Sequence, residues 1–130
     1  GIWTSGETSE AVARLLHEGE PQTAQTSALV KRAILYLNQH YTQSLSRWQV
    51  ADAINVSEDY LSRVFHRELA ISPWEYLNRY RVWQAGRLLV STTDSIRNIA
   101  LSTGFSDQAY FSRVFRKITG MSPQEFRQKG

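Results

Sequence analysis

Two arginines that stand fifty residues apart, Arg63 and Arg113, occupy the same position in two matching segments of the chain. A guanidinium group can donate two parallel hydrogen bonds, either to the O6 and N7 atoms of guanine or to a phosphate group. Gln108 can donate to and accept from adenine in the same way, and the hydroxyls of Ser62 and Ser112 can bond to several bases. These residue types in this arrangement favour binding to a polyanion.

The distribution of charge along the chain agrees with this hypothesis. Residues 29–130 contain 14 Lys and Arg against 8 Asp and Glu, whereas residues 1–28 contain one arginine and four glutamates. Only three of the 15 cations are lysine, so most of them carry the planar guanidinium that suits phosphates and guanine edges.

Composition excludes several kinds of chemistry. The chain has no cysteine, which rules out a disulfide framework, a thiolate metal site and a thiol nucleophile. The three histidines, His17, His40 and His66, lack the spacing of metal ligands. No serine–histidine–aspartate pattern, phosphate-binding loop or carboxylate pair is apparent. We therefore expect no enzymatic activity, no metal and no cofactor.

The chain also lacks the marks of a membrane or secreted protein. No apolar stretch approaches the roughly 20 residues that a membrane-spanning helix needs, and no secretory signal is visible. We expect a cytoplasmic protein with no membrane partner. The chain begins with glycine and its only methionine is Met121, so we expect it to be part of a longer protein.

An internal repeat organises most of the chain. Between residues 62–76 and 112–126, seven of fifteen positions are identical. Further upstream the match continues at an offset of forty-nine, which places one added residue in the second copy near Gln108 and Ala109. The same supersecondary unit therefore occurs twice.

Each copy is predicted to contain a short helix, a three-residue break and a longer helix. The short helices are predicted at about residues 47–54 and 95–103, and they end at Asn55 and Gly104. Asparagine and glycine readily adopt the left-handed conformation that ends a helix. Such a unit is typical of a helix-turn-helix, whose second helix can enter the major groove of DNA. Since no period-2 alternation is long enough to indicate a sheet, we predict an all-α fold.

The longer helix of each copy has an apolar face, which we expect to be buried, and a polar face, which we expect to be exposed. Ser57 and Ser106 are predicted to be the N-caps of these helices. Inward-facing residues are predicted to be Leu61, Val64, Phe65 and Leu69 in the first copy, and Phe111, Val114, Phe115 and Ile118 in the second. Outward-facing residues are predicted to be Asp59, Ser62, Arg63 and His66, and then Gln108 or Ala109, Ser112, Arg113 and Arg116.

The aromatic residues Tyr60, Phe65, Tyr110, Phe111 and Phe115 have helical spacing, which predicts core positions rather than a base-stacking platform.

The remaining segments complete the predicted domain organisation. A helix capped by Ser27 is expected to end near His40, and a short helix is expected at about residues 10–17. A longer helix begins at Ser72, where Glu75 is predicted to close a capping box, and continues to about Ser91. Its 19 or so residues span roughly 28 Å, close to the roughly 34 Å between successive major-groove turns. The predicted units are an approach segment or linker over 1–28, a first subdomain over about 29–71, a linker helix over about 72–91 and a second subdomain over about 92–130.

Residues 29–127 resemble the DNA-binding domain of the AraC/XylS family of bacterial transcription regulators. The second copy resembles the family signature nearly from end to end, including Gly104, the run from Tyr110 to Lys117, Pro123 and Phe126. This resemblance implies seven helices in two helix-turn-helix subdomains joined by a long helix, binding an asymmetric double-stranded DNA site as a monomer. It also implies an N-terminal sensor or receiver domain in the full-length protein, and RNA polymerase as a partner.

The resemblance places the family's base-reading positions at Asp59, Ser62 and Arg63, and at Gln108, Ala109, Ser112 and Arg113. The complete predicted DNA interface comprises Ser57, Asp59, Ser62, Arg63, His66, Ser106, Gln108, Ala109, Ser112, Arg113, Arg116 and Lys117.

Two other functions can be weighed against a sequence-specific transcription regulator. A DNA-modifying enzyme could use such a unit for targeting, as alkyl-transferring repair proteins do, but those need a cysteine acceptor that this chain lacks. The alternative that stays open is a helical protein-interaction module of a larger signalling protein, which would have no DNA binding of its own.

Overall fold

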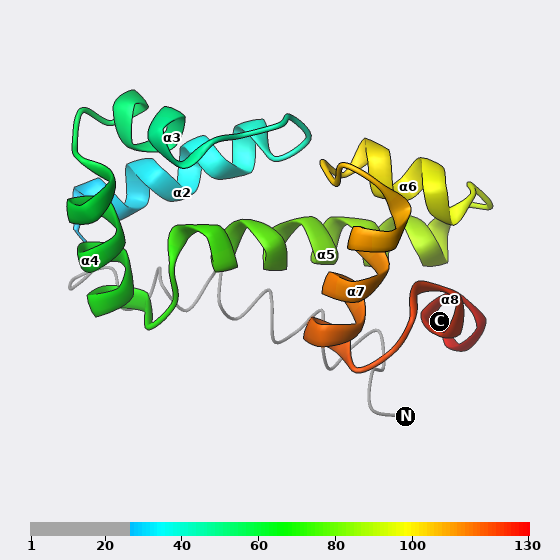
Figure 1. The fold of residues 1–130 in the computed structure, drawn as a ribbon. Coiled ribbons are helices and arrows are strands. Elements are labelled where there is room, and N and C mark those ends of the chain that lie inside the picture. The colour runs from blue at the N-terminus through cyan, green and yellow to red at the C-terminus, as the bar shows by residue number, and fades with distance from the viewer. Residues whose placement is uncertain (1–26) are drawn as a thin grey trace.

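The structure, a computed structural model, describes residues 27–130, which form seven helices and no strand (Figure 1). The helices are α2 (Ala28–His40), α3 (Arg47–Ala53), α4 (Glu58–Leu69), α5 (Pro73–Ser91), α6 (Ile96–Ser102), α7 (Gln108–Thr119) and α8 (Pro123–Lys129). The predicted all-α class is confirmed. The helix expected at about residues 10–17 lies outside the described residues.

Each of these helices begins at a short polar side chain that accepts a hydrogen bond from the first turn. This group satisfies one of the backbone N–H donors that a helix start leaves without an intrahelical partner. Ser27 has this role in α2, as predicted, and Ser72 in α5, where Pro73 follows as the first helical residue. The caps in chain order are Ser27, Ser46, Ser57, Ser72, Ser95, Asp107 and Ser122.

The capping box predicted at the start of α5 is not formed. Glu75 turns away from Ser72 and pairs with Arg79, one turn further along α5, at 2.7 Å. The equivalent box at the start of α8 is complete, because Glu125 accepts a hydrogen bond from the backbone of Ser122 at 2.9 Å. That hydrogen bond holds the pKa of Glu125 below its usual value.

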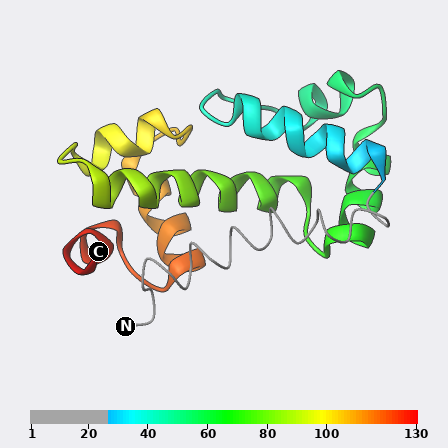
Figure 2. The ribbon, with the colours of Figure 1, turned by 180° about the vertical axis from the view of Figure 1, so that it is seen from behind.

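Helix α5 contributes to two separate hydrophobic cores. Its first part buries Tyr76 and Leu77 in a cluster with residues of α2, α3 and α4. Its second part buries Val82, Ala85 and Leu89 in a cluster with residues of α6, α7 and α8. One continuous helix therefore supports both halves of the described chain (Figure 2).

A buried arginine joins the two halves. Arg81 on α5 is only 5% exposed, and its guanidinium donates from Nε to the backbone oxygen of Tyr41 and from Nη2 to that of Gln43, each at 2.8 Å. The same guanidinium lies over the ring of Phe105, 5.9 Å from its centroid. Burial lowers the pKa of Arg81 from its usual value, but a guanidinium stays protonated at neutral pH. Arg81 thus connects the α2–α3 loop with the α6–α7 turn.

Gly104 allows this approach. Its φ is +96°, and a β-carbon added there would lie 2.1 Å from the backbone oxygen of Tyr41 and 2.6 Å from Nε of Arg81. Only glycine fits without moving one half of the molecule away from the other. Ala70, after α4, also has a left-handed backbone, with φ of 65°, but it is exposed.

We predict that Gly104→Ala lowers the free energy of unfolding by roughly 2–4 kcal/mol, because left-handed strain adds to an overpacked contact. The matched change Ala70→Gly relieves strain without touching a neighbour and should raise it by roughly 0.5–1 kcal/mol. Urea unfolding followed by circular dichroism measures both. If the loss of stability caused by Gly104→Ala were no larger than the gain caused by Ala70→Gly, the close approach at Gly104 would be contradicted.

Candidate nucleic-acid interface

Two helix-turn-helix units are present, one formed by α3 and α4 and the other by α6 and α7. Both turns contain a residue with positive φ, Asn55 at 60° and Gly104 at 96°. The predicted left-handed conformation at these two positions is therefore confirmed. In each unit the helix after the turn has 12 residues.

One of the two predicted caps of these helices is wrong. Ser57 caps α4, and its Oγ accepts from the backbone of Tyr60 at 3.1 Å. In α7 the cap is Asp107 instead of Ser106, and its Oδ1 accepts from the backbone of Tyr110 at 2.7 Å. Two adjacent residues could each cap this helix, so the sequence alone did not decide between them.

The added residue of the second copy lies in the turn rather than near Gln108 and Ala109. Because α4 starts at Glu58 and α7 at Gln108, the two helices correspond at an offset of fifty from their first residue onward. Asp59 therefore corresponds to Ala109. An insertion inside the helix would rotate every later side chain by about 100°, whereas an insertion in the turn leaves the exposed faces equivalent.

The exposed faces of α4 and α7 contain nearly all of the predicted interface. Phe65, Phe111 and Phe115 are fully buried, so both helices have their apolar faces inward as expected. Ser112 is half-buried. The other predicted interface residues are exposed, namely Ser57, Asp59, Ser62, Arg63, His66, Ser106, Gln108, Ala109, Arg113, Arg116 and Lys117.

The prediction that Tyr60 is a core residue is wrong, because its side chain is 45% exposed. Its position has a different explanation. The guanidinium of Arg63 lies 5.8 Å from the centroid of the Tyr60 ring, and Arg113 lies 5.9 Å from that of Tyr110. Since a cation is attracted to an aromatic face, each tyrosine helps to orient the arginine one turn further along its helix. Tyr110 is half-buried against the second core.

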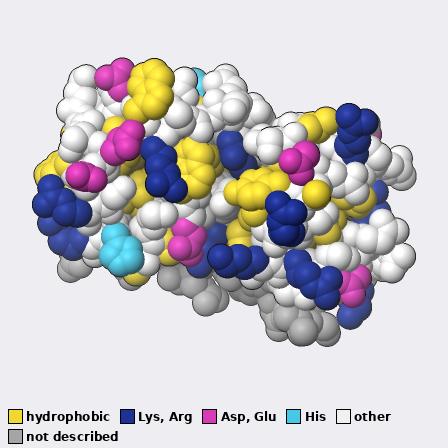
Figure 3. Space-filling view, viewed as in Figure 1, with side chains coloured by type: hydrophobic (Ala, Val, Ile, Leu, Met, Phe, Trp, Pro, Cys, Tyr) yellow, Lys and Arg dark blue, Asp and Glu magenta, His cyan; other side chains and the backbone are white. Residues whose placement is uncertain are grey.

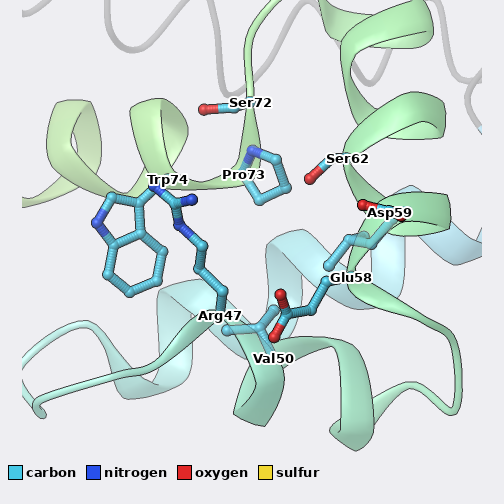
Figure 4. Close-up of a pocket in the computed structure, with 9 residues that line it drawn as sticks. Arg47, Val50, Glu58, Asp59, Ser62, Ser72, Pro73 and Trp74 are labelled. Atoms are coloured by element: carbon cyan, nitrogen blue, oxygen red, sulfur yellow. The ribbon is translucent and has the colours of Figure 1, made fainter.

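A hollow of about 190 Å³ lies where α3, α4 and α5 meet (Figure 4). Asp59 and Ser62 line it from α4, and Arg47 and Trp74 line it from α3 and α5. The Arg47 guanidinium lies 5.8 Å from the centroid of the Trp74 ring. The sequence gives no sign of Arg47 or Trp74 at the interface, because both lie outside the two longer helices and only the fold brings them beside α4.

A wider depression, which we call the central trough, adjoins this hollow. It has a volume of about 650 Å³ and is lined by α7, by the first half of α5 and by Arg47. The two depressions share Arg47, Ser72 and Trp74, so the faces of α4 and α7 border one continuous hollowed surface. Arg113 and Lys117 line the trough from α7. On this side of the molecule Lys and Arg side chains lie over both ends and between them (Figure 3).

The second helices of the two helix-turn-helix units, α4 and α7, differ in charge. Helix α4 begins with Glu58 and Asp59, whereas the first turn of α7 contains no acidic residue. In the last turn of α7, Arg116 lies 3.8 Å from Glu125, with both side chains more than half exposed. Such an exposed pair contributes little to stability.

Neither a cluster of metal ligands nor a membrane-spanning helix is found among residues 27–130. Residues 27–130 contain no group of three metal-ligating side chains. His40 packs its ring against Tyr36, with centroids 4.4 Å apart, and His17 lies outside the described residues. Among the described helices, none has the length and hydropathy to cross a membrane.

Comparison with known proteins identifies the family. A family model described as a helix-turn-helix domain matches residues 50–129. The HTH-type transcriptional regulator YisR of Bacillus subtilis is 39% identical over 95 residues, which cover 73% of this chain and 33% of YisR. The arabinose operon regulatory protein of Escherichia coli is 39% identical over 99 residues, which cover 75% of this chain and 34% of that protein. The chain belongs to the AraC/XylS family of transcription regulators.

A solved AraC/XylS-type structure supports the same assignment. The C-terminal domain of AraT, a response regulator from Geobacillus stearothermophilus, has a TM-score of 0.78 and 40% sequence identity, covering 82% of this chain and 88% of that one. The chain spans about a third of the length of the curated AraC/XylS relatives named above. It is thus similar to the DNA-binding part of larger regulators.

The assignment of Asp107 as the cap of α7 can be tested directly. We predict that Asp107→Ala lowers the free energy of unfolding by about 1 kcal/mol, because it removes the acceptor for the first turn of α7. Ser106→Ala should change it by less than about 0.5 kcal/mol. Thermal unfolding of the two variants measures the difference, and a larger loss from Ser106→Ala would contradict the assigned cap.

Proposed function

We propose that this AraC/XylS domain binds double-stranded DNA sequence-specifically by placing α4 and α7 in consecutive segments of the major groove. The observation that carries the proposal is the presentation of two equivalent reading helices along one connecting helix. In Figure 1, α4 stands at the N-terminal end of α5 and α7 crosses in front of its C-terminal half. The 19 residues of α5 span roughly 28 Å, close to the roughly 34 Å between successive major-groove turns.

The residues proposed to read bases are those exposed on the two helices. Arg63 and Arg113 are suited to guanine, and Gln108 is suited to adenine. Asp59 can accept from the amino group of cytosine, but it repels phosphate. Arg116 and Lys117 are proposed to contact the backbone, which positions the helix without reading sequence.

The full-length protein is proposed to be a bacterial transcription regulator in the cytoplasm that joins this domain to an N-terminal sensor or receiver domain and contacts RNA polymerase. The similarity to AraT, a response regulator, supports a receiver domain among these possibilities. The domain itself is proposed to bind as a monomer, since one chain already contains both helices that would enter the major groove. It is also proposed to have no enzymatic activity.

Substitution of the paired arginines tests the reading role. Selection from a random duplex library should yield two sequence blocks about one helical turn apart. Arg63→Ala and Arg113→Ala should each cost about 1–3 kcal/mol of binding free energy and relax base preference in one block only. Arg32→Ala is the control, because Arg32 is exposed on α2, a helix that belongs to neither of the two helix-turn-helix units.

Two results would contradict the proposal. If neither arginine variant changed the selected sequences, the assigned reading role would be wrong. If the unmodified domain shifted no duplex at any salt concentration, the protein-interaction module would be favoured instead.

Because Arg81 joins the two halves of the domain, α4 and α7 should be held at a fixed distance. We therefore predict that the two sequence blocks must have a strict spacing. One added base pair moves the second block by about 3.4 Å and rotates it by about 35°, so the unmodified domain should bind the lengthened site much more weakly. Arg81→Met removes both bonds to the α2–α3 loop and should reduce this discrimination, whereas Arg81→Lys should have an intermediate effect. Titration of both duplexes with each variant, after circular dichroism confirms its helix content, measures the ratio. An unchanged ratio in folded Arg81→Met would contradict the prediction.

A further inference from the structure

The central trough is lined by positively charged side chains from both halves of the domain. Arg47 and Arg79 line it from the first half of the domain, and Arg113 and Lys117 line it from the second. Glu75 is the only acidic residue among the residues that line it. A depression with four cations and one anion attracts a polyanion along its whole length.

The guanidinium of Arg79 is available to such a ligand. Its Nη2 donates to Oε2 of Glu75 at 2.7 Å, but the two side chains are 38% and 48% exposed. A solvent-exposed pair four residues apart on a helix is held only weakly. A phosphate, which accepts several hydrogen bonds and carries a full charge, can compete for the same guanidinium.

Arg47, the first residue of α3, is held in place beside the trough. Its guanidinium packs on the ring of Trp74 (Figure 4), and both residues border the trough as well as the smaller hollow. The attraction of the cation to the indole does not use up the N–H groups of the guanidinium, which can still donate hydrogen bonds. The indole of Trp74 already restricts the Arg47 side chain. Less conformational entropy is therefore lost when Arg47 binds a ligand.

We infer that the central trough is a binding site for the phosphodiester backbone of the DNA, at the point where it crosses between the two major-groove segments. The inference rests on the proposed function. When α4 and α7 occupy consecutive major-groove segments, the minor groove between them faces the protein, and a strand at its border passes over the first half of α5. Arg79 and Arg47 are then backbone-binding residues that carry no sequence information.

The salt dependence of binding tests this inference. Each lost phosphate contact should reduce the slope of log K against log salt by about 0.9, which corresponds to about eightfold weaker binding at 0.1 M salt. Arg79→Ala and Arg47→Ala should each show this loss on the selected duplex, with unchanged base preference in both blocks. Glu75→Gln should strengthen binding, because it removes a repulsive charge and releases Arg79. Arg32→Ala should leave the slope unchanged.

Replacement of single phosphates locates the contact. A duplex with uncharged methylphosphonates between the two blocks should bind the unmodified domain less tightly and should bind Arg79→Ala with no further loss. The same replacement inside a block should weaken both proteins equally.

Two outcomes would overturn the inference while leaving the proposed function intact. One is an unchanged salt slope in Arg79→Ala and Arg47→Ala while Arg113→Ala still weakens specific binding. The other is coupling of Arg79 to phosphates inside a block rather than between the blocks. A domain that binds no duplex would instead overturn the proposed function itself, and the inference with it.

Discussion

The contact between Arg81 and the α2–α3 loop determines how the two halves of this domain are placed. Each half has its own hydrophobic core, so without the contacts of Arg81 the helix α5 alone would have to resist bending of one half against the other. Arg81 opposes such a movement because its two hydrogen bonds connect the middle of α5 to Tyr41 and Gln43. A buried cation that lost these acceptors would be costly. Gly104 completes the joint by letting the second turn reach the same carbonyl.

The phase of α5 determines the direction in which each half projects. Leu77 belongs to the first core and Val82 to the second. These residues are five positions apart, which corresponds to about 140° around a helix. One residue added between them would rotate the whole second half by about 100° and remove α7 from its place beside the central trough. The length and register of this helix therefore matter as much to the interface as the exposed residues themselves.

The sequence predicted what depends on local chemistry. The caps at Ser27 and Ser57, and the left-handed positions at Asn55 and Gly104, follow from side-chain and backbone preferences within a few residues. The predicted cap of α7 is wrong because Ser106 and Asp107 are adjacent and either could cap the helix. The predicted burial of Tyr60 is wrong because periodicity does not distinguish a buried ring from an exposed ring that lies near an arginine. The joint at Arg81 and the central trough were not predicted, because they bring together residues about 30 to 40 positions apart or more.

The duplication did not leave two equal halves, and the differences follow a physical pattern. Helix α7 has one carboxylate at its start, the cap Asp107, and no acidic residue within it, whereas α4 starts with Glu58 and Asp59 and also contains Glu68. Carboxylates at a helix start stabilise the helix but repel phosphate. On the proposed interface, α7 and the trough would therefore supply most of the attraction that is independent of sequence, while α4 would depend more on base contacts made by Arg63 and Asp59. A single duplicated unit can in this way combine a strongly attracting half with a strongly discriminating one.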